Sequence, residues 1–181
     1  NEIVHHYCFN LKKNINNHHN PYFSINHRDI GKNNPTYIIA ELSCNHNQDI
    51  QLAYQLIDAA AQAGADAVKL QTHTADTMTI NCDRFLYDLY ESAHTPWEWH
   101  KDLKEYANCK GLDLFSSPFD VSAVDFLESL DMPAYKIASF EITDHVLIKK
   151  VAQTGKPVII SSGMASLNEL NDAITLLREN G

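Results

Sequence analysis

Charged side chains stand inside or at the ends of several short apolar runs of this chain. Lys69 lies in the middle of residues 67–72, and Lys136 lies within residues 134–139. A third run, residues 37–41, ends on a carboxylate. Apolar runs of this length are typical of buried strands, where a lysine requires an anionic ligand or a carboxylate partner. The sequence therefore predicts a polar pocket for a small charged molecule at the ends of these strands.

Amide and hydroxyl groups extend this pattern. In a strand over residues 67–72, Lys69 and Gln71 would share one face, because successive side chains alternate. Serine pairs close two further runs: Ser116 with Ser117, and Ser161 with Ser162. Lysines, hydroxyls and backbone N–H groups together supply the charge and the donors that a phosphate requires. The sequence thus indicates a ligand that carries a phosphate.

A purely structural interpretation of the charged residues remains open. Glu41 could pair with Lys69, and Glu141 with Lys136, only to neutralise buried charge. Ion pairs of this kind also occur outside active sites. Their recurrence at the same end of successive strands favours a functional site.

Other polar residues near the strand ends are expected to have ordinary roles. His46 and His73 follow strand ends, but single histidines are more often loop residues than acids, bases or ligands. Cys44 is expected to fill space as a small apolar side chain. An excursion between two strand–helix repeats is expected over residues 75–94, and residues 84–94 within it are a candidate lid, since such excursions tend to be functional.

The chain repeats a strand followed by a helix. Strands are expected at residues 37–41, 67–72, 112–117, 134–139 and 157–162. Helix starts are predicted by capping residues, at Thr95, Asp120, Asp144 and Ser166, and the first and last of these begin a capping box. No hairpin separates these strands, so they are expected to be parallel.

Parallel strands joined by helices form an open doubly wound sheet or a (β/α)8 barrel. The glycine signature of a dinucleotide fold is missing after the first strand, and polar residues at several strand ends favour the barrel. A full barrel takes about 250 residues. We therefore predict an α/β fold, a (β/α)8 TIM barrel truncated after about five β/α units, over residues 22–181. A short hairpin is expected at residues 22–30, and residues 1–21, rich in Asn and His, are expected to be a disordered leader.

The composition narrows the possible partners. The net charge of −9 over 181 residues argues against a general nucleic-acid surface, which is basic. No apolar run reaches the roughly 20 residues that span a bilayer, so no membrane partner is expected. The four cysteines are widely spaced, which favours reduced thiols in the cytoplasm and argues against a metal site built on them.

Five ordered motifs resemble the sialic acid synthase family. They are Glu41-Leu-Ser-Cys-Asn-His-Asn, Lys69-Leu-Gln-Thr, Phe115-Ser-Ser-Pro-Phe-Asp, Tyr135-Lys-Ile-Ala-Ser-Phe-Glu and Ile160-Ser-Ser-Gly-Met. Within the family, residues 74–78 and 86–100 are most similar to the pseudaminic acid synthases. The resemblance covers about residues 22–181.

The resemblance implies a condensation of phosphoenolpyruvate with the open-chain aldehyde of an acetamido sugar, 2,4-diacetamido-2,4,6-trideoxy-altrose in that subfamily. The products would be a nine-carbon 2-keto sugar acid and phosphate, and Mn²⁺ or Mg²⁺ would polarise the aldehyde oxygen as a Lewis acid. The implied catalytic residues are Glu41, Lys69 and Glu141. The implied substrate-binding residues are Gln71, Ser117, Lys136, Ser139, Ser161 and Ser162.

The chain departs from the family in two respects. The histidines that bind the divalent metal in the family would lie beyond Gly181, so no metal ligand is expected here. We also expect this chain to lack the family's C-terminal antifreeze-like domain, which reaches into the partner's active site in the homodimer. We therefore expect the isolated chain to be inactive, with uncovered strand edges.

Three alternatives remain. An N-acetylneuraminate synthase would use a different sugar. A Schiff-base keto-acid aldolase would form an imine on Lys69 or Lys136. A non-catalytic half-barrel would at most retain weak anion binding.

Overall fold

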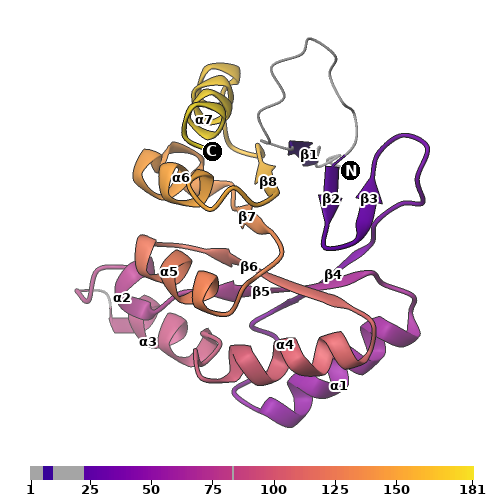
Figure 1. Cartoon of the computed structure of the whole chain (residues 1–181). Coiled ribbons are helices and arrows are strands. Elements are labelled where there is room, and N and C mark those ends of the chain that lie inside the picture. The colour runs from indigo at the N-terminus through magenta and orange to yellow at the C-terminus, as the bar shows by residue number, and fades with distance from the viewer. Residues whose placement is uncertain (1–5, 10–22, 83) are drawn as a thin grey trace. The chain divides into compact units, whose positions relative to one another are not determined.

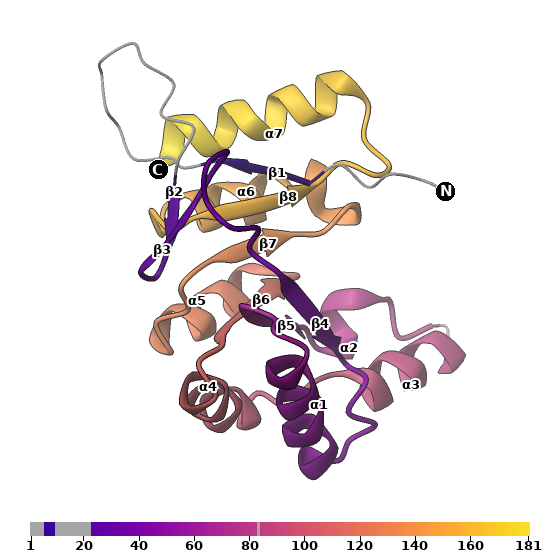
Figure 2. The same ribbon diagram turned by 90° about the vertical axis from the view of Figure 1, so that its right-hand side faces the viewer.

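The computed structural model describes residues 6–9, 23–82 and 84–181 (Figure 1). It consists of two compact units. One unit is Tyr37–Met132, and the other combines the chain up to Thr36 with Pro133–Gly181. Figure 2 shows the same ribbon turned by 90°.

The unit Tyr37–Met132 is built on three parallel strands with β5 in the centre. The strands are β4 (Ile39–Ser43), β5 (Ala67–Thr72) and β6 (Asp113–Pro118). The helices are α1 (Ile50–Gln62), α2 (Ala75–Met78), α3 (Arg84–Ala93), α4 (Trp99–Cys109) and α5 (Val121–Ser129). Helices α1, α4 and α5 pack against the strands, and α1 lies beside α4 (Figures 1 and 2).

Helix α1 shows why the sequence folds this way locally. Its buried residues Ala53, Ile57 and Ala60 recur at the helical spacing and so form one apolar stripe. The Asp49 side chain caps the helix by accepting a hydrogen bond from the Gln51 backbone N–H at 2.8 Å. Gly64 follows the helix with φ of +79°, a left-handed conformation that glycine adopts without a Cβ penalty.

The second unit contains a hairpin and a group of strands covered by two helices. The hairpin pairs β2 (Phe23–Ile25) with β3 (Arg28–Ile30) antiparallel. Strand β8 (Val158–Ser161) pairs parallel with β7 (Tyr135–Ile137) and antiparallel with β1 (His6–Phe9). The remaining elements are the 3₁₀ helix η1 (Phe140–Thr143), α6 (His145–Ala152) and α7 (Leu167–Asn180), and α6 packs against α7.

Most sequence-based expectations of the fold are confirmed. Each of the five predicted strands is present and followed by a helix, and the N-terminal hairpin is present. Asp120, Asp144 and Ser166 cap their helices as predicted. The leader predicted over residues 1–21 lies outside the described residues except for strand β1, so its disorder stays a prediction.

The predicted capping box at Thr95 is wrong. Helix α4 begins at Trp99, and its N-cap Glu98 makes no side-chain capping hydrogen bond. Two tight turns precede the helix, in which the Trp99 and His100 backbone N–H groups donate to the carbonyls of Pro96 and Trp97 at 3.1 Å each. The Thr95 hydroxyl is instead hydrogen-bonded to a histidine side chain, so a tertiary contact outweighs the local capping pattern.

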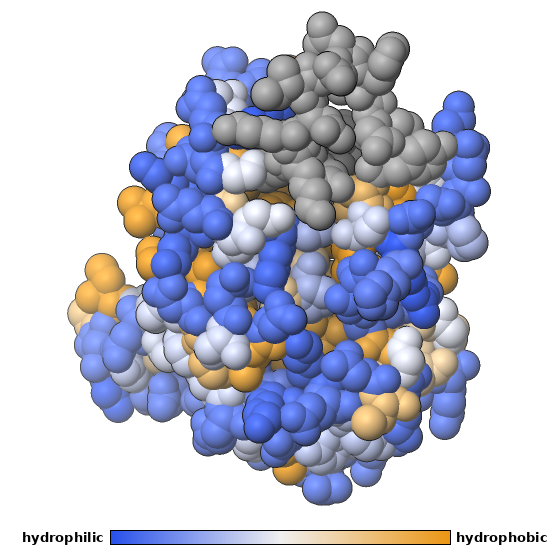
Figure 3. Space-filling model, viewed as in Figure 1, coloured by the Kyte–Doolittle hydropathy of each residue, from blue (hydrophilic) through white to orange (hydrophobic). Residues whose placement is uncertain are grey.

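Helix α3, within the segment predicted as a lid, buries none of its residues. Its exposed apolar side chains are Phe85, Leu86 and Leu89, and Ile80 lies just before it. Apolar surface is visible over α2 and α3 at the left of Figure 3. A lid function of this segment stays a prediction.

A buried polar network joins β5 and β6 to α4. Thr72 Oγ1 lies 2.8 Å from His100 Nε2 and 2.7 Å from Ser116 Oγ. His100 Nδ1 lies 3.2 Å from the Pro96 carbonyl oxygen, so this nitrogen carries the proton and Nε2 accepts from Thr72. Complete burial lowers the pKa of His100 to about 4, since the uncharged ring is favoured there.

We predict that this histidine makes the fold sensitive to mild acid. The unfolded chain binds a proton at His100 near pH 6.5, whereas the folded chain excludes it until about pH 4. The contribution of His100 to the free energy of unfolding is therefore fully present above pH 6.5. It is lost as the pH falls towards 4, by up to about 3 kcal/mol. Urea midpoints measured from pH 7 to 4 should fall less steeply in His100→Phe than in the wild type. Parallel curves for the two proteins would contradict this assignment.

Candidate anion-binding site

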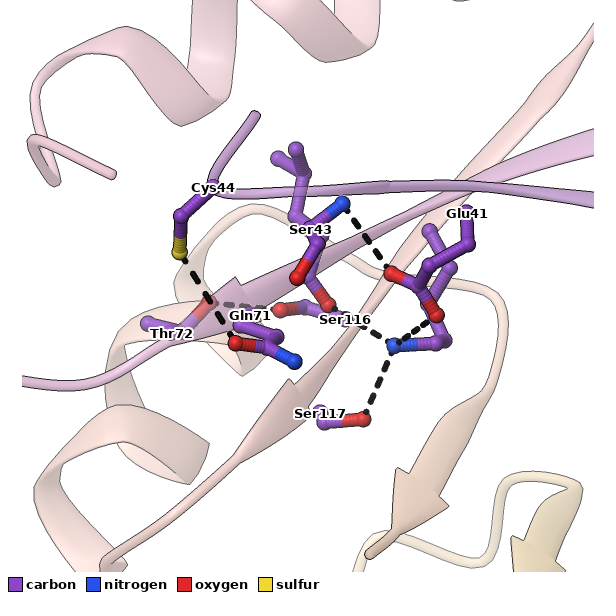
Figure 4. Close-up of polar contacts among 9 residues, drawn as sticks. Glu41, Ser43, Cys44, Gln71, Thr72, Ser116 and Ser117 are labelled. Atoms are coloured by element: carbon purple, nitrogen blue, oxygen red, sulfur yellow. Dashed lines mark hydrogen bonds and ion pairs between the residues drawn. The ribbon is translucent and has the colours of Figure 1, made fainter. Parts of the chain in front are cut away.

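The side chain of Lys69 is the centre of a polar cluster on β4, β5 and β6. Its neighbours Glu41, Gln71 and Ser117 are labelled in Figure 4. Its Nζ lies 2.8 Å from Glu41 Oε2, 3.3 Å from Ser117 Oγ and 3.4 Å from the Leu70 carbonyl oxygen. Lys69 is only 6% exposed. An ammonium group removed from water in this way is costly unless it is paired, and the carboxylate and hydroxyl supply that pairing.

A bulge in β4 directs Glu41 towards Lys69. Glu41 is paired in register with Lys69 and Ser43 with Leu70, so Leu42 is the additional residue of β4. Ser43 has φ of +51°, an uncommon value for a residue with a side chain. Its backbone N–H donates to Glu41 Oε1 at 3.0 Å. Both carboxylate oxygens of Glu41 are therefore held, one by a backbone amide and one by the ammonium group.

Gln71 and Ser117 complete the cluster. They are register partners on β5 and β6, and Gln71 lies two residues beyond Lys69 on the same face of its strand. The neighbouring Ser116 points to the opposite face, where it joins the network with Thr72. Of the predicted site residues, the structure thus brings Glu41, Lys69, Gln71 and Ser117 together. Ser116 and Ser117, which were predicted as a pair, face opposite sides of β6 and have different partners.

The remaining predicted residues lie in the unit that contains Pro133–Gly181. Register places Lys136 of β7 opposite Ile159 of β8, so Lys136 shares a face with Ser161, two residues further along. Ser162 follows β8, and its carbonyl oxygen accepts from the Ala165 N–H at 3.2 Å. The binding roles of these residues stay predictions.

Gly163 allows a close approach to Ser139. A Cβ added at Gly163 would lie 3.3 Å from Ser139 Oγ, which is tighter than ordinary van der Waals contact. The absence of a side chain at this position therefore leaves room for the Ser139 hydroxyl beside the loop that follows β8.

Glu141 has an unusual environment in η1. One oxygen, Oε2, is buried and has no hydrogen-bond partner among the described residues. Burial raises the pKa of Glu141, while the charge of Lys136 acts in the opposite direction. A carboxyl group with a raised pKa can hold a proton closer to neutral pH, as an acid or base catalyst must.

Sequence reasoning missed several polar residues around the cluster. Cys44, His46 and Thr95 are linked to Gln71 by hydrogen bonds. His46 lies in the loop after β4, as expected, but its hydrogen bond to Thr95 was not predicted, and neither were the polar contacts of Cys44 and Thr95. Their positions in the sequence, directly after the strand β4 or directly before the helix α4, could have indicated that they lie near the site. His73, by contrast, is buried against the rings of Tyr90 and Phe119, and burial lowers its pKa to about 4.

A divalent metal ion does not fit the described residues. No group of three or more His, Cys, Asp or Glu side chains that could hold such an ion occurs within residues 6–9, 23–82 and 84–181. In the same part of the chain, no helix has the length and apolar character needed to cross a membrane.

Comparison with known proteins identifies the family to which this chain belongs. An N-acetylneuraminic acid (sialic acid) synthetase from Leptospira borgpetersenii, solved in complex with citrate, superposes with a TM-score of 0.83 at 32% identity, covering 88% of this chain and 55% of that one. The predicted α/β fold of the sialic acid synthase type is thereby confirmed over the part of the barrel that this chain covers. The sequence profile of the NeuB family matches residues 56–181, and the chain belongs to this family.

Relatives within the family are also similar in sequence. The pseudaminic acid synthase of Helicobacter pylori is 52% identical over 157 residues, which cover 80% of this chain and 46% of the relative. The N,N'-diacetyllegionaminic acid synthase of Campylobacter jejuni is 36% identical over 159 residues, covering 81% of this chain and 48% of the relative. The chain thus spans about half the length of these relatives.

The ion pair generates a prediction about stability. In Glu41→Gln, the Lys69 ammonium keeps its burial but loses its carboxylate, and the stability should fall by about 1–2 kcal/mol. Adding Lys69→Met should recover part of this loss, because the unpaired charge is removed. Urea denaturation without ligand, performed as a double-mutant cycle, measures the coupling. Strictly additive effects would show that the two groups do not stabilise each other.

Proposed function

We propose that this chain carries the phosphoenolpyruvate-binding part of a synthase for nine-carbon 2-keto sugar acids. In the proposed reaction, C3 of phosphoenolpyruvate bonds to the aldehyde carbon of an acetamido sugar, and the aldehyde oxygen takes up a proton. Water adds at C2, and the bond between C2 and the phosphate oxygen breaks to release phosphate. The observation that carries the proposal is the buried Lys69 ammonium group, held between Glu41 and Ser117 beside the Gln71 amide.

The arrangement around Lys69 suits an anionic oxygen. Lys69 donates to Ser117 Oγ, so the hydroxyl proton of Ser117 stays available to a phosphate or carboxylate oxygen. The ammonium group adds charge, and hydrogen bonds between charged groups are the stronger ones. Lys136, Ser139, Ser161 and Ser162, which lie in the unit that contains Pro133–Gly181, are proposed as further substrate-binding residues of the chain.

Glu41 is proposed to change partners when the substrate binds. Its side chain is 50% exposed, whereas Lys69 is buried, so an incoming anion would compete with Glu41 for the ammonium group. A carboxylate released in this way could accept a proton from the water that adds at C2. Glu141, with its raised pKa, is the proposed second acid or base.

The proposed sugar is 2,4-diacetamido-2,4,6-trideoxy-altrose, giving pseudaminic acid. The 52% identity to a pseudaminic acid synthase, against 36% to a legionaminic acid synthase, supports this choice. An N-acetylneuraminate synthase is the alternative within the family. For the complete enzyme the proposal includes Mn²⁺ or Mg²⁺ with ligands outside the described residues, and a homodimer in the cytoplasm. Residues 1–181 alone are proposed to have no synthase activity.

We predict that Lys69 is required for phosphoenolpyruvate. In the full-length protein, Lys69→Met should weaken phosphoenolpyruvate binding at least about 100-fold, because a charge-assisted contact is lost from a buried site. The matched control is Lys101→Met, which removes an exposed lysine of α4 and should change binding less than about twofold. Calorimetry measures the binding, and phosphate release with each candidate sugar measures the reaction. Unchanged binding in Lys69→Met would refute the proposal.

A Schiff-base aldolase would give a different result. A lysine that forms an imine attacks as a free amine, whereas Lys69 is held as an ammonium group by Glu41. Borohydride reduction in the presence of pyruvate should therefore label neither Lys69 nor Lys136. A label on either residue would favour the aldolase.

A further inference from the structure

A chain of hydrogen bonds leads from the loop after β4 to the Gln71 amide. It passes through His46, Thr95 and Cys44, all within the unit Tyr37–Met132. Cys44 and His46 follow β4 closely, whereas Thr95 is about fifty residues away in sequence. His46 and Thr95 are completely buried. The tautomer of His46, the first residue of this chain of hydrogen bonds, determines the direction in which each following group donates.

The histidine at the start of the chain has a defined tautomer. The Gln48 backbone N–H donates to His46 Nδ1 at 3.2 Å, so this nitrogen is an acceptor. Burial lowers the pKa of His46, and the charge of His94 lowers it further, so the ring is neutral near pH 7. The single ring proton is therefore on Nε2, which donates to Thr95 Oγ1 at 3.0 Å.

The same direction continues to Gln71. The Thr95 hydroxyl donates to Cys44 Sγ at 3.9 Å, and the Cys44 thiol donates to Gln71 Oε1 at 3.8 Å. Burial raises the pKa of the Cys44 thiol, which keeps its proton and remains a donor. Every group in the sequence from His46 to Cys44 thus both accepts and donates a hydrogen bond.

The backbone around His46 holds this chain in place. Asn47 and Gln48 have φ of +50° and +58°, left-handed values that are uncommon outside glycine. The Gln48 side chain donates to the carbonyl oxygens of Ser92, at 3.1 Å, and His94. The loop after β4 is thereby tied to the segment that carries Thr95.

The hydrogen bond from the Cys44 thiol to Gln71 Oε1 determines which end of the Gln71 amide faces the anion-binding site. The two ends of a glutamine amide have nearly the same shape, but one end accepts and the other donates. With Oε1 bound to Cys44, the amide nitrogen lies on the side of Ser117 (Figure 4). The amide is then available as a donor next to the Lys69 ammonium group.

We propose that Cys44 is a positioning residue that fixes the Gln71 amide with its N–H groups towards the substrate, where they donate to an acceptor oxygen. This inference rests on the proposed function, because it requires Gln71 to contact the substrate. It gives Cys44 a polar role through the neighbouring amide, where the sequence indicated only a space-filling thiol.

Kinetics of the full-length protein test this role with matched substitutions. Cys44→Ala removes the donor and should raise the KM of the substrate that Gln71 contacts by about three- to tenfold, the value of one hydrogen bond, with kcat nearly unchanged. Cys44→Ser keeps a donor and should restore the KM to within about twofold of the wild type. Thr95→Val, which breaks the chain one step earlier, should have a smaller effect in the same direction.

A double-mutant cycle separates positioning from general packing. Gln71→Ala should raise the same KM, and adding Cys44→Ala to it should have no further effect, because Cys44 acts only through the amide. Multiplicative effects of the two substitutions, or a Cys44→Ser variant as impaired as Cys44→Ala, would overturn the inference. The inference would also be overturned if Gln71→Ala left the KM unchanged while Lys69→Met weakened phosphoenolpyruvate binding as predicted. If Lys69→Met itself retained binding, the proposed function would be refuted instead.

Discussion

The burial of the Lys69 ammonium group is the constraint on which the site depends. An unpaired ammonium group at 6% exposure would be costly, and Glu41, at 2.8 Å, offsets that cost. Glu41 reaches this position because β4 carries a bulge and the Ser43 N–H holds its second oxygen. A pair of this kind is not needed for the stability of a sheet, since apolar residues of similar size serve as well. Its presence at the strand ends supports the proposal that the site binds an anion.

Strand alternation assigns neighbouring polar residues to two different tasks. On one face of β5 and β6, Lys69, Gln71 and Ser117 form the candidate site. On the other face, Thr72 and Ser116 are buried with His100 of α4 and satisfy one another's hydrogen bonds. The helix-facing network fixes the ends of the strands, so the groups on the opposite face project from a rigid base.

Much of the fold followed from local patterns in the sequence. Asp120 and Asp144 predicted helix starts because a carboxylate satisfies free N–H groups whatever the surroundings. The alternation around Lys69 predicted which side chains would lie together. Residues 134–139 are a strand only over Tyr135–Ile137, since η1 begins soon afterwards.

The remaining features depend on contacts between distant segments. The left-handed conformation of Ser43 is not encoded by a glycine, and the bulge that it accompanies could not be read from the apolar pattern. Thr95 has the side chain of a typical capping residue, but its hydroxyl is instead hydrogen-bonded to the side chain of His46, nearly fifty residues earlier. The link from Cys44 to Gln71 likewise joins the ends of two strands, which only the folded chain brings together.

A structure of the full-length protein with phosphoenolpyruvate bound is the most direct measurement of the central claim. The account predicts a phosphate or carboxylate oxygen within hydrogen-bond distance of Lys69 Nζ and Ser117 Oγ, with the Glu41 carboxylate displaced from the ammonium group. Phosphoenolpyruvate bound elsewhere, with the pair of Lys69 and Glu41 intact, would contradict it.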